Sequence, residues 1–158
     1  MTVVAVRRLQ KKEENKKTVD RLLPIDNIDE LYKESDYIVI ACPLTPLTHH
    51  LIGINELKKM KPQAIIINIA RGQIINELDL IVALKNKIIH AAALDVFNKE
   101  PLSKDSDLFK LKNVFLSPHI SGNFPEYQSD MVIQFGKNLN RYIEGKPVFN
   151  RICKKRLY

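Results

Sequence analysis

The hydrophobic positions of this chain alternate between two kinds of segment along most of its length. Short apolar runs rich in β-branched residues, such as AIIINIA at 64–70, are typical of strands that are covered on both faces of a sheet. Between these runs lie stretches that have apolar residues at helical spacing and capping residues beside them. The pattern predicts strands at 2–8, 36–42, 64–70, 88–96 and 113–117.

The helical stretches are predicted at 27–35, 55–60, 76–86 and 125–144. Asn55 and Asn76 are the expected N-caps of the second and third helices, because an Asn side chain accepts hydrogen bonds from the first free N–H groups of a helix. The last helix carries an apolar stripe that we expect to pack into a core. The stripe consists of Met131, Phe135, Leu139 and Tyr142.

This order of strands and helices predicts an α/β fold, in which a parallel sheet has helices on both faces. The first predicted strand begins at once after Met1, so we expect the reading frame to start inside a sheet and not at the start of a domain. The 158 residues fit one domain. We place it at 1–150 and interpret 151–158 as a basic C-terminal tail.

Composition narrows the class of protein. The chain is 45% hydrophobic and 27% charged, as soluble globular proteins are. No apolar stretch is long enough for a bilayer span and no signal-peptide core is visible, so we expect a cytoplasmic location and no membrane contact. Cys42 and Cys153 are far apart in the sequence, which argues against a disulfide framework and against a metal site. The net charge of +7 is dispersed and not interleaved with aromatics, which disfavours nucleic-acid binding.

Candidate chemistry lies where the predicted strands end. In open parallel sheets, ligands bind beyond the carboxyl ends of the strands. We therefore expect the residues at these points to share one edge of the sheet, together with Glu100 in the loop after the fourth strand. They are Cys42-Pro43, Ala70-Arg71-Gly72, Asp95 and Pro118-His119, and both Gly72 and Gly122 are expected to allow a close backbone approach.

An arginine, two carboxylates and a histidine in one cleft suit the reduction of a carbonyl group or its reverse. His119 can donate a proton to the carbonyl oxygen while a hydride arrives at carbon. Glu100 can orient the imidazole, and Arg71 can polarise the carbonyl and hold a substrate carboxylate. The hydride must come from a cofactor, and Asp95 can accept a hydrogen bond from a nicotinamide carboxamide. Singly, each residue also fits an ordinary structural role, so the hypothesis depends on their meeting.

Four motifs in order then resemble the D-isomer-specific 2-hydroxyacid dehydrogenases, which include glyoxylate/hydroxypyruvate reductases and phosphoglycerate dehydrogenase. The resemblance implies an enzyme with a Rossmann-like fold and with catalytic Arg71, Glu100 and His119. The motifs are CPLTPLTHHLI (42–52), INIARGQIINELDLIVAL (67–84), AALDVFNKEPL (92–102) and LSPHISG (116–122).

The resemblance also implies a set of cofactor contacts. Asp95 matches the aspartate that binds the carboxamide, and Ser121 and Gly122 match the turn beside the nicotinamide. The remaining contacts implied near the cofactor are those of Cys42, Pro43, Ile69, Ala70, Arg71 and His119.

Two departures from the family change the expectation. The phosphate-binding G-x-G-x-x-G is absent, since none of the five glycines has that spacing. The family's substrate domain is absent as well. We therefore expect an incomplete Rossmann-like, doubly wound parallel sheet that lacks the first strand and the glycine-rich turn. The strands at 2–8 and 36–42 then lose their shared neighbour, and we expect weak dinucleotide binding and little activity of this chain alone.

The cofactor and partner expectations follow from the resemblance. Arg7 stands where an acid would bind the ribose hydroxyls of NAD, and Arg8 follows it, which favours NADP over NAD. A solvated turn is the alternative. The expected substrate is a small 2-oxo or 2-hydroxy acid such as glyoxylate or hydroxypyruvate. The expected protein partner is a missing N-terminal half or a second copy. The alternative function is a non-catalytic α/β binding or regulatory module that pairs with another chain.

Overall fold

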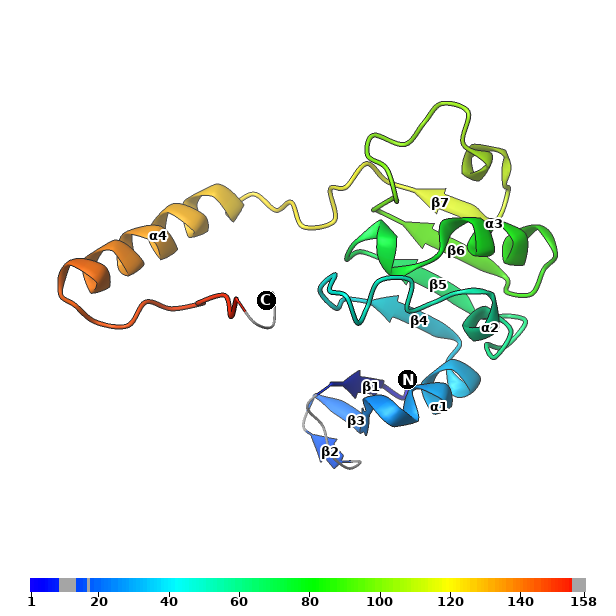
Figure 1. Cartoon of the computed structure of the whole chain (residues 1–158), viewed down its shortest axis with the longest axis horizontal. Helices are drawn as coiled ribbons and strands as arrows, with labels where there is room; N and C mark the ends of the chain where they lie inside the picture. Colours follow the sequence, from blue (N-terminus) through cyan, green and yellow to red (C-terminus); the bar gives the residue numbers. More distant parts are fainter. Residues whose placement is uncertain (9–13, 17, 155–158) are drawn as a thin grey trace. The chain divides into compact units, whose positions relative to one another are not determined.

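The computed structural model describes residues 1–8, 14–16 and 18–154. The chain divides into two compact units, Met1–Pro118 and His119–Tyr158. The first unit contains two β-sheets with the helices that pack on them, and the second contains one long helix (Figure 1). The domain boundary at residue 150 stays a prediction.

The larger sheet has four parallel strands in the order β4-β5-β6-β7, which confirms the predicted α/β fold. Each strand falls inside a predicted run, and the observed strands are shorter than the runs by one to three residues at either end. The strands are β4 (Tyr37–Ile40), β5 (Ile65–Asn68), β6 (Ala91–Leu94) and β7 (Val114–Leu116).

The smaller sheet has the order β1-β3-β2, and two of its strands were not predicted. Its strands are β1 (Val4–Arg7), β2 (Glu14–Lys16) and β3 (Val19–Pro24). β3 runs parallel to β1 and antiparallel to β2. Within the described residues, β1 and β4 each lie at an edge of their own sheet, as predicted for strands without a common neighbour.

Charged side chains explain why the hydrophobic pattern did not reveal β3. Asp20 accepts a hydrogen bond from the backbone N–H of Val3 at 2.7 Å. Arg21 forms ion pairs with Glu30 at 2.8 Å and with Glu34 at 2.6 Å. Both glutamates belong to helix α1, so these polar residues fix the strand to its neighbours and break the apolar run that pattern analysis depends on.

The helices α1 to α3 and the short 3₁₀ turns lie between the strands, and α4 follows β7. The sequence predicts a helix close to each of the four. Asn76 caps its helix by accepting a hydrogen bond from the N–H of Asp79 at 3.3 Å, which confirms the predicted cap. The helices are α1 (Ile28–Glu34), α2 (Ile54–Leu57), α3 (Glu77–Lys85) and α4 (Tyr127–Ile143), and the 3₁₀ turns are η1 (Ile25–Asn27), η2 (Gly72–Ile74) and η3 (Asp107–Lys110).

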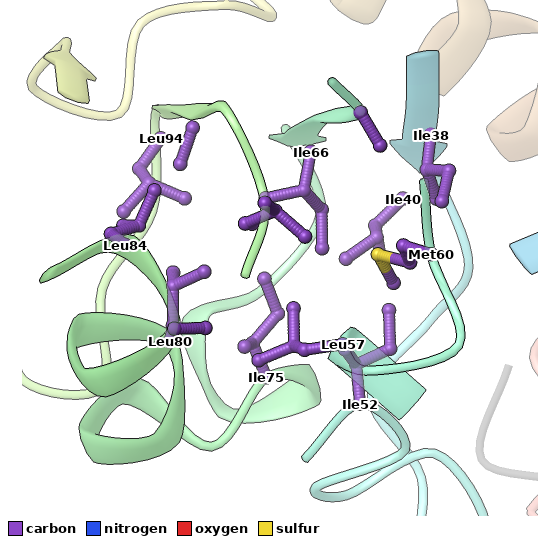
Figure 2. Close-up of a cluster of buried hydrophobic side chains, with 14 of the residues drawn as sticks. Ile38, Ile40, Ile52, Leu57, Met60, Ile66, Ile75, Leu80, Leu84 and Leu94 are labelled. Carbon is purple, nitrogen blue, oxygen red and sulfur yellow. The ribbon is translucent and has the colours of Figure 1, made fainter. Parts of the chain in front are cut away.

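The hydrophobic core lies between the four-stranded sheet and the helices α2 and α3. Figure 2 shows Leu57 of α2 and Leu80 of α3 directed toward Ile66 of β5, in a cluster whose labelled members are all buried. The opposite face of this sheet exposes large side chains, among them Tyr37 and Phe115. Within the first unit, α2 and α3 pack on the same face of this sheet.

Helix α2 begins earlier than predicted and is shorter. Its N-cap is Gly53 and not Asn55. Glu56 accepts a hydrogen bond from the N–H of Gly53, and Asp79 of α3 accepts one from the N–H of Ile54, both at 3.0 Å. The second partner is 25 residues away in sequence, so local capping rules could not locate this start.

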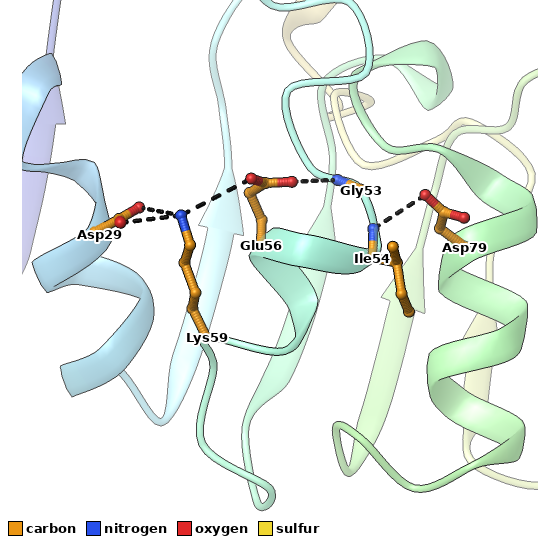
Figure 3. A network of polar contacts seen from close by, with 6 residues as sticks. All are labelled: Asp29, Gly53, Ile54, Glu56, Lys59 and Asp79. Atoms are coloured by element: carbon orange, nitrogen blue, oxygen red, sulfur yellow. Dashed lines mark hydrogen bonds and ion pairs between the residues drawn. The ribbon is translucent and has the colours of Figure 1, made fainter.

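The same polar network continues to α1 (Figure 3). The ammonium group of Lys59 contacts both carboxylate oxygens of Asp29 at 2.8 and 2.9 Å, and it lies 4.0 Å from Glu56. Three helices are thus joined by charged side chains above the core.

The apolar stripe of α4 is exposed, contrary to the prediction that it packs into a core. Among the described residues of α4 none is buried. The helix lies in the second unit, which contains no sheet in its described part against which the stripe can pack. The stripe comprises Met131, Phe135, Leu139 and Tyr142.

In the described part of the chain, no helix is long and apolar enough to cross a membrane.

Two leucines of α3 test the position of the core. Leu80 is 1% exposed and Leu78 is 75% exposed, so the same change has different consequences at the two sites. We expect Leu80→Ala to lower the free energy of unfolding by about 2–5 kcal/mol, because it leaves a cavity. Leu78→Ala is the matched control, with an expected change within about 0.5 kcal/mol. Chemical denaturation measures both values, and equal losses would contradict the described core.

Candidate active site

The carboxyl ends of β4 to β7 meet at one edge of the sheet because the four strands are parallel. Backbone hydrogen bonds continue one residue past the strands. The N–H of Ile69 donates to Ile40 at 3.4 Å, and the N–H of Ser117 donates to Leu94 at 3.0 Å. The segments that carry the candidate residues are therefore anchored to the sheet where they leave it.

Asp95 is the buried polar group of this edge. Its side chain follows β6 and is 3% exposed. One carboxylate oxygen accepts a hydrogen bond from the hydroxyl of Ser117 at 2.5 Å. A buried carboxylate with a fixed orientation suits the recognition of an N–H donor such as a carboxamide. Ser117 is not among the predicted site residues, although a hydroxyl at the end of a strand and two residues before His119 was a usable signal.

The turn after β5 and the loop after β6 touch backbone to backbone at Gly72. A Cβ atom placed on Gly72 would lie 1.9 Å from the carbonyl carbon of Phe97 and 2.5 Å from the backbone nitrogen of Asn98. No side chain fits there, so the close approach predicted for Gly72 is confirmed. At Gly122 a Cβ atom would meet nothing within 4 Å among the described residues, and the close approach expected there stays a prediction.

Two side chains hold this contact in place. The amide of Gln73 donates a hydrogen bond to the carbonyl of Asn98 at 2.9 Å, and Glu77 accepts one from the N–H of Asn98 at 3.1 Å. The turn that carries Arg71 and the loop that carries Glu100 are thereby locked to each other. These two hydrogen bonds could not be read from local sequence patterns, because Asn98 is more than 20 residues from both Gln73 and Glu77.

Glu100 lies on the exposed rim of the locked loop, where its carboxylate accepts a hydrogen bond from the N–H of Phe97 at 3.0 Å. It borders a largely apolar pocket of about 400 Å³. An apolar wall beside a carboxylate strengthens the electrostatic effect of that group on a neighbouring polar partner. The pocket is lined by Phe97, Glu100, Pro101, Leu102, Phe109, Leu116, Ser117 and Pro118.

Apart from Arg7 and Arg8, the other predicted residues of the first unit also lie at this edge. Arg71 is exposed, and its guanidinium donates to the carbonyl of Ala70 at 2.6 Å. Ile69, the residue before Ala70, is exposed as well. Cys42 is half-buried and Pro43 exposed just after β4. Burial raises the pKa of the Cys42 thiol, so it behaves as a small apolar group packed against the core.

The second unit carries His119, Ser121 and Gly122, so the predicted residues are divided between the two units. His119 is the first residue of its unit and has a φ of 55°. The left-handed region is uncommon for residues other than glycine and is found frequently at functional sites. The structure thus brings together the segments of Arg71, Asp95 and Glu100, and it places the histidine at the start of the adjoining unit.

Arg7 and Arg8 belong to the three-stranded sheet and not to the edge described above. Arg7 is the last residue of β1, Arg8 follows it, and both are exposed. Among the described residues, no group of three His, Cys, Asp or Glu side chains is placed to hold a metal ion.

A comparison with protein-family models matches residues 1–121 to the D-isomer specific 2-hydroxyacid dehydrogenase, NAD binding domain. The matched part includes the strands β1 to β7 and the four motifs described above, except Gly122, the last residue of the fourth motif. The chain belongs to this family. The resemblance that the four sequence motifs carry is thereby confirmed, and so is the Rossmann-like character of the α/β fold.

Members of the dehydrogenase family resemble this chain over most of its length. It is 48% identical over 120 residues to glyoxylate/hydroxypyruvate reductase B of Enterobacter agglomerans, which covers 76% of this chain and 37% of the relative. It is 46% identical over 119 residues to glyoxylate reductase of Thermococcus gammatolerans, covering 75% and 35%. The chain thus spans little more than a third of these relatives.

The fold matches a solved structure of the same dehydrogenase family even more extensively. That structure is a D-isomer specific 2-hydroxyacid dehydrogenase from Xanthobacter autotrophicus Py2 in complex with NADPH and MES. The TM-score is 0.88 at 30% identity, and the match covers 98% of this chain and 62% of the other. The dehydrogenase fold therefore extends over both units of this chain.

The contact at Gly72 generates a sharp test. We expect Gly72→Ala to lower the free energy of unfolding by about 1–3 kcal/mol or more, because the new methyl group must displace the backbone of Phe97 and Asn98. Gly136→Ala in α4 is the control, since a Cβ atom there meets nothing within 4 Å and alanine favours a helix. Denaturant unfolding measures both, and a Gly72→Ala protein as stable as the control would contradict the close approach.

Proposed function

We propose that this chain is the nucleotide-binding part of an enzyme that reduces small 2-oxo acids, such as glyoxylate or hydroxypyruvate, to 2-hydroxy acids. One observation carries the proposal. The turn of Arg71 and the loop of Glu100 are locked together at the edge that holds the buried carboxylate of Asp95. Few structural roles need a cation and two carboxylates fixed at the open end of a parallel sheet.

The residues divide the work of the proposed reaction. Arg71 holds the carboxylate of the 2-oxo acid and polarises the carbonyl that is reduced. His119 donates the proton that the carbonyl oxygen takes up, and Glu100 orients the imidazole. Asp95 accepts a hydrogen bond from the carboxamide of the nicotinamide. The surrounding cofactor contacts are made by Cys42, Pro43, Ile69, Ala70, Ser121 and Gly122. The cofactor supplies the hydride.

We propose NADP(H) over NAD(H) as that cofactor. Arg7 ends β1 with an exposed guanidinium, and Arg8 follows it. Two arginines at the end of this strand suit the 2′-phosphate of NADP, whereas the hydroxyls of NAD call for an acid. The Xanthobacter autotrophicus relative, which is 30% identical, was crystallised with NADPH.

Further polypeptide is part of the proposal. The chain spans 37% of the Enterobacter agglomerans relative, and β1 and β4 both offer a strand edge within the described residues. We propose that activity needs an N-terminal half that supplies the phosphate-binding turn, and that the assembled enzyme is a homodimer. An α/β module that pairs with another chain without catalysing a reaction is the alternative, and the two open edges also favour it.

Complementation tests the proposed activity. The chain is mixed with the N-terminal part of the Enterobacter agglomerans relative that precedes the matched region, and NADPH oxidation is followed with glyoxylate and hydroxypyruvate. We expect little turnover by the chain alone and measurable turnover by the mixture. His119→Gln is expected to lower kcat/KM about 10²–10⁴-fold, because it removes the proton donor. Arg71→Lys is expected to lower it about 10–100-fold, through loss of the two-pronged contact.

Controls separate catalysis from folding. His90→Gln changes an exposed histidine before β6, at the opposite edge of the sheet, and is expected to leave kcat/KM unchanged. A soluble, folded mixture that binds NADPH without turning over either acid would favour the non-catalytic module. Equal losses from His119→Gln and His90→Gln would contradict the role given to His119.

A further inference from the structure

Asn68 is a polar residue in an apolar row. It ends β5, where it is paired with Ile40 of β4 on one side and Leu94 of β6 on the other. It faces the core and is 1% exposed. A buried carboxamide destabilises a protein unless both its donor and its acceptor are satisfied. An apolar side chain could be buried at this position without needing hydrogen-bond partners. The presence of an amide therefore indicates that its hydrogen bonds have a role.

Both halves of the carboxamide are bound to the turn that follows. The oxygen of Asn68 accepts a hydrogen bond from the N–H of Ala70 at 3.0 Å, and its nitrogen donates one to the carbonyl of Arg71 at 2.9 Å. The two bonds fix the backbone on both sides of the Ala70–Arg71 peptide plane. The chain therefore leaves β5 in one conformation and enters η2 with Arg71 at a set place.

The backbone of Asn68 also holds the residue that follows the neighbouring strand, β6. Its carbonyl accepts a hydrogen bond from the N–H of Asp95 at 3.0 Å. One residue thus holds the backbones of Ala70, Arg71 and Asp95. In the proposed function, Ala70 contacts the cofactor, Arg71 binds the substrate, and Asp95 binds the carboxamide of the nicotinamide.

We propose that Asn68 is a positioning residue, which sets the backbone of the Ala70–Arg71 turn for the nicotinamide cofactor and for the 2-oxo acid. The ligand part of this inference rests on the proposed function, whereas the positioning of the turn does not. Asn68 acts through its hydrogen bonds to the turn, since its buried carboxamide is bound to Ala70 and Arg71. It differs from the predicted site residues because its side chain faces the core and not the open edge.

The first measurement is the exchange of the Ala70 amide hydrogen in the whole chain, followed by NMR. Asn68→Ala removes both side-chain bonds, and loss of one buried hydrogen bond is expected to speed this exchange about 10-fold or more. Asn68→Asp keeps the acceptor for Ala70 and loses the donor to Arg71. Burial raises the pKa of a carboxyl group at this position, and its protonated form restores an O–H donor. We therefore expect the Asn68→Asp protein to come closer to the wild type at pH 5 and to differ most at pH 8.

Asn113 provides a matched control at the other edge of the same sheet. Its amide donates to the carbonyls of His90 at 2.9 Å and Leu84 at 3.4 Å, so it also holds backbone in place. Asn113→Ala is expected to lower the melting temperature, as Asn68→Ala does, and to leave the exchange of Ala70 unchanged. If both variants speed that exchange equally, or neither does, Asn68 is a general stabilising residue and the positioning role is wrong.

The second measurement is the affinity for NADP⁺, by titration calorimetry of the complemented protein. We expect Asn68→Ala to weaken binding about 10-fold and Asn113→Ala to leave it unchanged. Unchanged affinity in Asn68→Ala, with faster exchange of Ala70, would overturn the ligand part of the inference. A wild-type protein that binds no dinucleotide would instead refute the proposed function, and the exchange experiment would still decide whether Asn68 positions the turn.

Discussion

The backbone of Gly72 lies directly against the backbone of Phe97 and Asn98, and the geometry of the site depends on this contact. Backbone atoms cannot rotate out of each other's way as side chains can, so the two segments move as one body. The hydrogen bonds of Gln73 and Glu77 to Asn98 keep the body closed. Such preorganisation matters for a reaction in which two charged groups must meet one small substrate, because misplacement by about 1 Å can reduce rates about 100-fold.

The parallel sheet anchors the two segments that meet at Gly72. Its apolar rows bind α2 and α3 on one face, which leaves the ends of the strands available for polar groups. Hydrogen bonds then continue past the strands to Ile69, Asp95 and Ser117, so the first residue of each loop keeps the regularity of the sheet. The residues within each strand stabilise the core, and the candidate functional residues follow its carboxyl end. Asn68, the last residue of β5, lies between these two regions.

The sequence predicts the parts of this molecule that depend on local pattern. The four strands of the larger sheet, the Asn76 cap and the edge that gathers Arg71, Asp95 and Glu100 all follow from runs, caps and strand ends. The strand β3 and the start of α2 depend on partners far away in sequence, such as Glu34 and Asp79, and were therefore missed. The apolar stripe of α4 has a periodicity that indicates one apolar face, but periodicity does not say where a covering surface lies.

The boundary between the two units falls between Pro118 and His119, and this limits where the histidine can go. Ser117 is held to β6 by its backbone and to Asp95 by its hydroxyl. Two residues of extended chain span about 7 Å at most, so the Cα atom of His119 stays within that distance of the Cα atom of Ser117. The Cα atom of His119 is thus held close to the end of β7 by covalent geometry, however the second unit is oriented.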